Sequence, residues 1–444
     1  MSKVLIVGSG GREHAIGWSI AQDPDVEEVI YAKGNPGTAA DEKCRNVDLD
    51  GTKKENFPSL ADLVEKEGIT EVVVGPEQPL VDGVVNFFNR RGYKRIFGPT
   101  CLASCIESDK FYSNNVMEAL RIPQADSAQC WTIEDAIRAI KDRTVLDSGS
   151  GPFGIVIKAR DLTAGKGVYV CDTIEEALAK LPEHIISFKS EEVLIAERLF
   201  GQEFSVFGIS DGNRVVPLEI SVQDHKPLQD GDKGPNTGGM GAYCPAPVAD
   251  AAMVRYVADK MMTPAVQKMK AWGIEYKGFL YAAVIMTDVG PKILEYNCRF
   301  GDPEAQPAVM MLKNGLFQPI KYALDGRLDQ IKVEFNPGAA CCVVMASNGY
   351  PGSYEKGFEI GGLELASLNK DVKVFHAGTG IKDGKIVTAG GRVLGVTAYS
   401  AEGIADAQQK AYGSVHYIQS STEQRNKGKK VFVFRSDIAA KALR

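Results

Sequence analysis

The sequence predicts a multidomain protein of the α/β and α+β classes, with a parallel-sheet N-terminal domain, an antiparallel core and a small β-rich C-terminal domain. A chain of 444 residues is long for one hydrophobic core, so roughly two to four domains are expected. Strand and helix patterns alternate over residues 3–103, as they do in parallel sheets. Further along, apolar strands follow one another across glycine turns, which indicates antiparallel pairing. We therefore place the domains at residues 1–103, 104–332 and 333–444.

Composition and charge exclude several classes of protein. Hydrophobic residues make up 44% of the chain and charged residues 24%, as in ordinary soluble globular proteins. A net charge of −6 gives no reason to expect nucleic acid or an anionic membrane as a partner. There is no run of about 18 apolar residues, and the N-terminus has too few for a signal peptide. The nine cysteines are scattered without CxxC spacing, so we expect reduced thiols and a cytoplasmic protein.

In the N-terminal domain, strands are expected at KVLIVG, EEVIYA, EVVVGPE and RIFGP, with helices at residues 13–21, 59–67 and 86–91 between them. Ligands of such sheets bind beyond the carboxyl ends of the strands. Turns rich in glycine and proline lie at three of these ends, at residues 8–13, 34–38 and 75–80. We expect them to converge on one pocket whose candidate binding residues are Gly10, Gly11, Arg12, Pro76 and Glu77.

The first turn, GSGGRE, resembles a dinucleotide fingerprint only in part. Glu13 stands where the third glycine of that motif belongs, and the second strand ends at Lys33 without the acid that would hold an NAD ribose. Arg12 instead places a guanidinium beside backbone amides at a helix N-terminus, which suits a single phosphate. A phosphorylated small molecule is therefore favoured over NAD.

The middle of the chain begins with helical patterns at residues 108–121 and 132–142, followed by a flexible loop at 147–152. Residues 154–170 then form two strands, with one period-2 face at Ile155, Ile157, Val168 and Val170. The pattern indicates an antiparallel core for this domain.

Lysines mark this hairpin as a candidate phosphate site. The loop between the strands carries Lys166 between two glycines; it is not a Walker A sequence, and an ordinary surface hairpin is an equal alternative to a loop that closes over phosphates. Lys158 lies inside an apolar strand, where an unpaired ammonium is costly. We expect it to face an anion, either a carboxylate or a ligand phosphate.

Two further segments carry candidate binding residues. Glu197 ends one strand and Glu203 begins the next, an arrangement that can frame an adenine edge and a ribose or can be a plain hairpin. Residues 234–241 hold four glycines and a proline, which form helix or strand only at a cost. Because Met240 and Tyr243 would be unusual in a disordered loop, we expect an ordered substrate loop here.

Residues 279–307 predict a β-hairpin that bears a metal site. Glu295 and Asn297 are two residues apart on its second strand, so their side chains share a face. A carboxylate and an amide oxygen are suitable ligands for Mg²⁺, which completes its shell with phosphates and waters. Arg299 and Asp302 follow directly and add a cation and a second acid. The alternative is a hairpin with polar residues on its solvent face.

The remaining residues predict few catalytic groups. We expect a helix over residues 310–326, strands at AACCVVMAS, KVFHAG and GGRVLGVTA, a helix over 401–414 and a last strand at KKVFVF. His376 and Arg392 are the polar candidates here, and a structural role is favoured for each.

Taken together, these motifs resemble the phosphoribosylamine–glycine ligase (glycinamide ribonucleotide synthetase) family of ATP-grasp enzymes. The resemblance extends over nearly the whole chain. It is carried by VLIVGSGGREHA, GNPGTA, VVVGPEQPLVDG, FGPT, LTAGKGV, QDHK, GPNTGGMGAYCPAP, GFLYA, LEYNCRFGDPEAQP, VVMASNGYPGSY, VFHAGT and TAGGRVLGVTA. PNTGGMGAY and EYNCRFGDPE, in this order behind GSGGREH, are specific to the family.

The resemblance implies an ATP-grasp core with a small lid at about residues 125–200. It also implies that ATP, glycine and 5-phosphoribosylamine give glycinamide ribonucleotide, ADP and phosphate through glycyl phosphate. Contacts with neighbouring enzymes of purine synthesis would be weak. By position the residues match as follows: Glu295 and Asn297 as ligands of Mg²⁺ or Mn²⁺; Lys110, Lys158, Lys166, Glu197 and Glu203 at ATP; Arg299 and Asp224 at glycine; Gly10, Gly11, Arg12, Pro76, Glu77, Gly239 and Met240 at the substrates.

The chain departs from the family pattern at Arg160-Asp161, where a small acidic or serine–glycine pair is usual, and at Thr163. These positions lie next to the expected phosphate loop, so they bear on ATP affinity. The alternatives are another ATP-grasp ligase, which would lack PNTGGMGAY, and a nucleotide-binding regulator without turnover. A regulator would have lost Glu295, Asn297 or Lys158, and all three are present.

Overall fold

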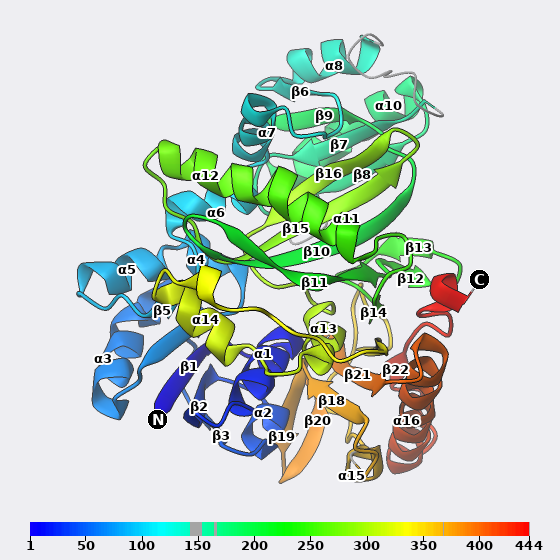
Figure 1. Ribbon diagram of the computed structural model, residues 1–444. Coiled ribbons are helices and arrows are strands. Elements are labelled where there is room, and N and C mark those ends of the chain that lie inside the picture. Colours follow the sequence, from blue (N-terminus) through cyan, green and yellow to red (C-terminus); the bar gives the residue numbers. More distant parts are fainter. Residues whose placement is uncertain (143–152, 164–166, 367, 444) are drawn as a thin grey trace.

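The structure is a computed structural model that describes residues 1–142, 153–163, 167–366 and 368–443 (Figure 1). The predicted loop at 147–152 and Lys166 lie outside these residues. Within them the N-terminal sheet, a separate small sheet and a large sheet follow one another along the chain (Figure 1). Among the described helices, none is long and apolar enough to cross a membrane.

The N-terminal domain is the predicted parallel sheet, with strand order β3-β2-β1-β4-β5. The central strand is fully buried over Val4–Val7, as its uninterrupted apolar sequence requires. β3, α2 and α4 are short elements that the sequence patterns did not predict. The strands are β1 (Ser2–Gly8), β2 (Val26–Lys33), β3 (Cys44–Val47), β4 (Glu71–Val74) and β5 (Ile96–Phe97), and the helices are α1 (Gly11–Ala21), α2 (Pro36–Ala40), α3 (Phe57–Glu67), α4 (Glu77–Val81) and α5 (Val84–Arg90).

A four-stranded antiparallel sheet, β6-β9-β7-β8, lies in the region expected to be the lid and has its own hydrophobic core; we call it the lid sheet. The period-2 prediction holds for Ile155 and Ile157 but is wrong for Val168 and Val170, which are 36% and 41% exposed. Register explains the error, because Ile155 pairs with Cys171 and so β8 turns its other face to the core. The elements are α6 (Cys101–Ser108), α7 (Lys110–Leu120), β6 (Ser127–Cys130), α8 (Ile133–Lys141), β7 (Ile155–Ala159), β8 (Val168–Cys171), α10 (Ile174–Phe188) and β9 (Val193–Glu197).

A nine-stranded sheet runs through the rest of the molecule in the order β16-β15-β10-β11-β14-β17-β21-β18, with β22 paired to β17. The C-terminal strands therefore continue the sheet of the central domain across the β14–β17 contact. Its strands are β10 (Gln202–Asp211), β11 (Val215–Asp224), β14 (Gly241–Cys244), β15 (Lys277–Thr287), β16 (Gly290–Asn297), β17 (Ala339–Ser347), β18 (Val372–His376), β21 (Arg392–Ser400) and β22 (Phe432–Val433).

Four local expectations are corrected. β9 and β10 lie in different sheets, so Glu197 and Glu203 do not belong to one hairpin. The glycine-rich stretch contains strand β13 (Lys233–Asn236), paired with β12 (Pro227–Gln229). The helix expected over 310–326 is two helices, α13 (Ala305–Met311) and α14 (Phe317–Leu324), whereas α16 (Ile404–Arg425) runs beyond residue 414.

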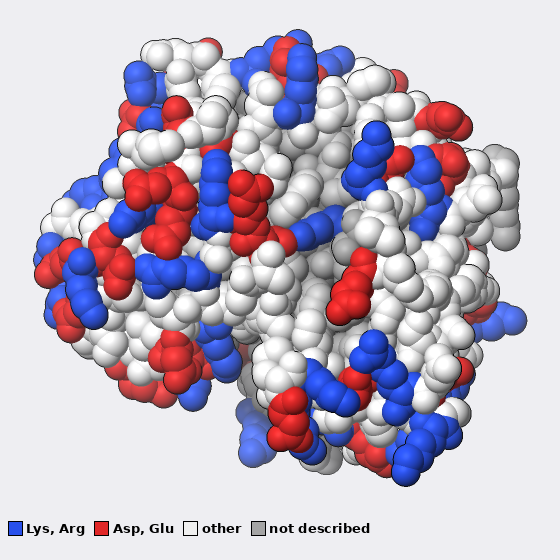
Figure 2. All heavy atoms as spheres, turned by 90° about the horizontal axis from the view of Figure 1, so that it is seen from below, with Lys and Arg blue, Asp and Glu red and all other residues white. Residues whose placement is uncertain are grey.

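The remaining elements complete the surface: α11 (Ala251–Val257), α12 (Thr263–Ala271), α15 (Leu363–Ala366), β19 (Thr379–Lys382) and β20 (Lys385–Thr388). Short 3₁₀ turns occur at Lys54–Asn56, Leu328–Gln330 and Ala440–Leu443, and a π turn at Ala258–Met262. On the face seen in Figure 2, positive and negative side chains are interspersed, and the surface is hollowed near its middle.

Candidate active site

Glu13 organises the turns at the carboxyl edge of the N-terminal sheet. Its carboxylate accepts a hydrogen bond from the N–H of Gly10, the N-cap of α1, at 2.8 Å and so caps the start of this helix. A Cβ atom on Gly75 would lie 2.3 Å from Glu13 Oε1, and one on Gly8 2.5 Å from Glu13 Cγ. The residue that breaks the dinucleotide motif is therefore the one that brings the first and third turns together. Asn35 joins the second turn to them, because its Nδ2 donates to the carbonyl of Ser9 at 2.9 Å.

Alternating charges link these turns to the predicted metal hairpin. Arg12 contacts Glu13 at 2.6 Å and Glu77 at 3.6 Å. Glu77 Oε2 in turn lies 3.3 Å from Arg299 Nε. The Nη2 of the same guanidinium lies 3.2 Å from Oε1 of the buried Glu107. Burial opposes ionisation of Glu77, but the two guanidinium groups outweigh it and lower the pKa of Glu77 to about 2. Five residues thus form one continuous ion-pair chain, and three of them, Arg12, Glu77 and Arg299, were predicted for the substrate sites.

Glu295 and Asn297 lie side by side on β16, as predicted. Asn297 Nδ2 is 3.5 Å from Glu295 Oε1, and Asn297 Oδ1 accepts a hydrogen bond from Arg299 Nη2 at 3.4 Å. Burial alone would raise the pKa of Glu295, but Lys110 and Lys158 lower it to about 2, so the carboxylate is charged. Turning the Asn297 amide oxygen toward Glu295 would break only these two long contacts.

The oxygen atoms of Glu295 and Asn297 suit a hard cation that takes its remaining ligands from phosphates and waters. Among the described residues, no group of three or more His, Cys, Asp or Glu side chains could hold a metal ion. A carboxylate and an amide oxygen are suitable for Mg²⁺ or Mn²⁺ when phosphates and waters supply the other ligands. The site therefore fits a metal that arrives with a phosphorylated ligand.

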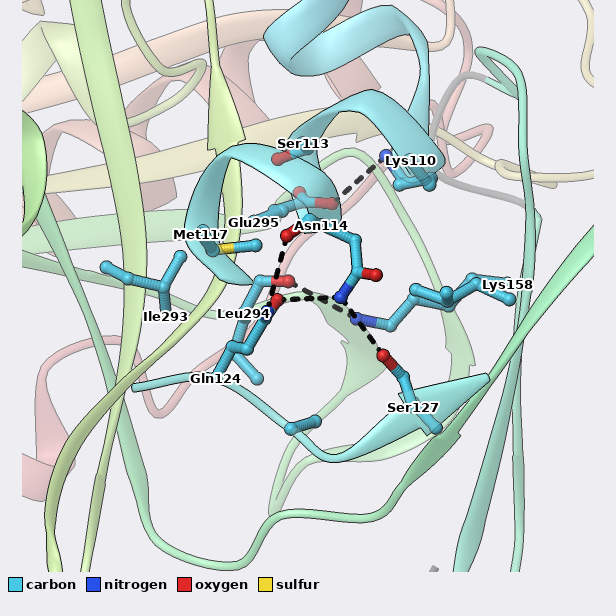
Figure 3. A pocket seen from close by; sticks show the side chains of 13 residues that line it. Lys110, Ser113, Asn114, Met117, Gln124, Ser127, Lys158, Ile293, Leu294 and Glu295 are labelled. Carbon is cyan, nitrogen blue, oxygen red and sulfur yellow. Dashed lines mark hydrogen bonds and ion pairs between the residues drawn. The ribbon is translucent and has the colours of Figure 1, made fainter. Parts of the chain in front are cut away.

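Two lysines reach the same cavity from different elements (Figure 3). Lys110, the first residue of α7, lies 3.4 Å from Glu295 Oε2. Lys158 on β7 donates to the carbonyl of Leu294 at 3.2 Å. Burial lowers the pKa of Lys158, and the charge of Glu295 opposes that shift. The expected anion near Lys158 is therefore Glu295, although the direct bond goes to a backbone carbonyl.

The two predicted adenine and ribose acids are held by lysines. Glu197 accepts from Lys292 at 2.9 Å and from the N–H of Asp126 at 3.1 Å. Glu203 accepts from Lys226 at 2.8 Å, and this ammonium lowers the pKa of Glu203. Glu197 is the last residue of β9 in the lid sheet, and Glu203 is near the start of β10 in the large sheet. The two acids therefore flank the linker between these sheets.

The glycine-rich loop packs against the turn that follows the hairpin. A Cβ atom on Gly239 would lie 2.4 Å from Pro303, and Arg392 bonds to the Asp302 carboxylate at 2.9 Å and to the carbonyl of Gly238. The Met240 side chain is fully buried. Arg392 therefore has the structural role expected for it, because it hydrogen-bonds both the glycine-rich loop and the turn after the hairpin.

Sequence patterns did not identify Glu304 and Glu107 as members of the site. Glu304 is 4% exposed, and Asp224, 10% exposed at its side chain, adds a like charge close to it. The sequence could have indicated Glu304, because it belongs to the GDPE stretch beside Asp302. No sequence pattern indicates Glu107, because its partner Arg299 lies 192 residues further along the chain.

Three family models of phosphoribosylglycinamide synthetase match the chain: the N domain over residues 2–107, the ATP-grasp (A) domain over 108–305 and the C domain over 340–441. The chain belongs to this family. A phosphoribosylamine–glycine ligase of Rhodopirellula baltica is 46% identical over 427 residues, which are 94% of this chain and 95% of the relative. One from Pseudomonas aeruginosa is 45% identical over 415 residues, covering 92% and 93%.

Solved structures agree. The phosphoribosylamine–glycine ligase of Thermotoga maritima aligns with a TM-score of 0.78 and 32% identity over 98% of this chain and 99% of that one. The biotin carboxylase domain of Hydrogenobacter thermophilus 2-oxoglutarate carboxylase aligns at 0.68 with 14% identity over 97% and 96%, which shows a shared fold. The predicted family, ligase class, and fold with parallel N-terminal sheet, ATP-grasp core and small C-terminal domain are confirmed.

Proposed function

We infer that this chain joins glycine to 5-phosphoribosylamine in purine synthesis, consuming ATP and releasing glycinamide ribonucleotide, ADP and phosphate. Membership of the family supports the activity. The observation that carries it is the arrangement of Lys110, Lys158 and Glu295 around one cavity, with Asn297 beside Glu295. Two cations and a metal-binding pair are what a nucleotide's phosphates require.

A carboxylate is a poor electrophile, so glycine is first converted to glycyl phosphate and the sugar amine then attacks its carbonyl carbon. The protein's task is to align the reactants and neutralise phosphate charge. Lys110, Lys158 and Lys166 hold the phosphates, and Glu197 and Glu203 hold the adenine and ribose ends of ATP. Mg²⁺ or Mn²⁺, bound by Glu295 and Asn297, would screen the phosphate charge.

The second half of the site binds the substrates that are joined. Asp224 and Arg299 attract the ammonium and carboxylate groups of glycine. Gly239 and Met240 belong to the substrate loop beside the bound glycine. The buried Met240 side chain fixes the conformation of that loop. The 5-phosphoribosylamine site lies at the turns of the N-terminal sheet and is formed by Gly10, Gly11, Arg12, Pro76 and Glu77, with the Arg12 guanidinium facing the phosphate. We place the enzyme in the cytoplasm, where weak contacts with neighbouring enzymes of the pathway would transfer this labile amine.

The test is ADP release with Mg-ATP, glycine and freshly prepared phosphoribosylamine, compared among wild type, Glu295→Ala and Glu334→Ala. Glu334 is a matched control because it pairs with Lys313 at 3.3 Å, much as Glu295 pairs with Lys110 at 3.4 Å. We expect release to require glycine and the sugar amine together, to collapse in Glu295→Ala and to persist in Glu334→Ala.

Other outcomes identify the alternatives. Turnover with a different carboxylate and none with glycine would assign the chain to another group of ATP-grasp ligases. ATP binding without turnover of any carboxylate would make it a nucleotide-binding regulator.

A further inference from the structure

Arg160, the departure from the family pattern, is the centre of a clasp between the lid and α7. Its Nε and Nη2 donate to the two carboxylate oxygens of Asp109 at 3.1 and 2.6 Å, and its Nη1 donates to Glu192 at 2.8 Å. The guanidinium carbon also lies 5.2 Å from the ring centres of Phe111 and Trp131. A bidentate ion pair that also stacks on two rings has a fixed geometry, which lysine could not reproduce.

The clasp fixes the start of α7. Asp109 is the N-cap of this helix, and its Oδ1 accepts from the N–H groups of Phe111 and Tyr112 at 2.9 and 3.1 Å. The carbonyl of Arg160 accepts from the N–H of Lys110 at 2.9 Å. Lys110, the first residue of the helix, is thus held through its own backbone and through the neighbouring cap, and both contacts lead to Arg160.

Lys110 is the part of this corner that reaches the cavity. Its ammonium lies 3.4 Å from Glu295 and lines the same cavity as Lys158. Lys158 is on β7, two residues before Arg160, which directly follows that strand. Arg160 does not line the cavity. Because the guanidinium charge is already paired with Asp109 and Glu192, we expect its effect on a ligand there to pass chiefly through Lys110.

We propose that Arg160 is a positioning residue for the phosphate end of ATP: it holds Lys110 at a fixed place relative to Lys158, so that both ammonium groups meet the phosphates without rearrangement. This rests on the proposed nucleotide role of the two lysines. Preorganised charges bind more tightly than charges that must first be ordered. The residue that departs from the family pattern thereby supports nucleotide binding.

The proposal is tested by calorimetric binding of Mg-ATP without glycine, so that no turnover is needed. We expect Arg160→Ala to bind about tenfold more weakly, because a displaced Lys110 would lose the equivalent of one charge-assisted hydrogen bond to the phosphates. Arg160→Lys should recover only part of the affinity because it lacks the planar fork. Arg138→Ala is the matched control: Arg138 is a lid arginine paired with Asp135 at 3.5 Å and 77% exposed, and its loss should change affinity less than about twofold.

A double-mutant cycle with Lys110→Ala separates positioning from a general loss of structure. If Arg160 acts through Lys110, then Arg160→Ala should weaken Mg-ATP binding by less than about twofold in the Lys110→Ala background. An equal loss in both backgrounds, or wild-type affinity in Arg160→Ala, would overturn the proposal. Should Arg160→Ala fail to fold, Arg160→Lys enters the same cycle, and wild-type affinity in that variant refutes positioning. If Lys110→Ala itself leaves affinity unchanged, the nucleotide role of Lys110 fails instead.

Discussion

Glu304 carries a carboxyl group whose charged form the fold disfavours. It is 4% exposed, and burial together with the charge of Asp224 raises the pKa of Glu304 to about 7, against the opposing charges of Arg299 and Lys226. The titratable and charged side chains that act on it or feel its charge are Asp224, Lys226, Tyr281, Arg299 and Cys342. Replacing Glu304 by glutamine keeps the shape and removes the charge, which isolates the cost of that charge.

The sign of the effect follows from proton binding. Between its ordinary pKa of 4.5 and about 7, the folded protein retains a proton on Glu304 that the unfolded chain has released. The contribution of Glu304 to stability is therefore greatest below pH 4.5 and is lost as the pH rises through 7. Each pKa unit corresponds to about 1.4 kcal/mol, so the charged form costs about 3 kcal/mol above pH 7. Glu304→Gln should be more stable than wild type by this amount at pH 8 and equal to it near pH 4.5.

Thermal unfolding midpoints of wild type and Glu304→Gln between pH 4.5 and 8.5 measure this difference. For 444 residues, at about 2.1 cal/mol/K per residue, a gain of about 3 kcal/mol corresponds to roughly 3 °C. The Asp224→Asn background should reduce the difference, because it removes the like charge next to Glu304. A midpoint difference that stays constant across the pH range, or one that grows toward low pH, would refute the reasoning.

Further predictions concern the ion pairs around the site. Glu77→Gln should lower the thermal midpoint at pH 7 by the equivalent of about 2 kcal/mol, because two arginines keep the pKa of Glu77 at about 2; wild type and variant should converge as the pH falls from 4.5 toward 2. Arg392→Ala should cost about 2 kcal/mol in chemical denaturation, because the bonds to Asp302 and the glycine-rich loop are lost. Asp41→Asn should speed hydrogen exchange over residues 372–376, since His14, which accepts the N–H of residue 376 at 2.8 Å, loses its charged partner at 3.0 Å.

The part of the site that could be predicted from the sequence lies within single elements. Glu295 and Asn297 share a face because alternate residues of one strand always do, whatever the strand packs against. Lys158 signalled a binding site because a lysine within an apolar strand needs a partner, and that argument requires no knowledge of the partner's position. The parallel sheet followed in the same way from the alternation of strands and helices.

The parts that could not be predicted depend on contacts between distant residues. The sequence of residues 193–211 is that of a hairpin, yet tertiary packing divides its strands between two sheets. Val168 and Val170 alternate correctly, but register decides which face of β8 meets the core. The role of Glu13 depends on Gly75, which lies in a different βα unit. Local periodicity contains no information on any of these pairings.

The ion-pair chain through Glu77 has a consequence for substrate binding. In the structure Arg12 and Arg299 are already ordered by Glu77, so they need little rearrangement to meet an anion. A phosphate arriving at Arg12 adds negative charge beside Glu77, which favours the movement of that carboxylate toward Arg299. Arg299 Nη2 also lies 3.4 Å from Oδ1 of Asn297, so in the proposed assignment a phosphate at the N-terminal turns and a metal at the hairpin would act on one shared guanidinium. From that assignment we predict that occupancy of the two halves of the site is coupled through Arg299.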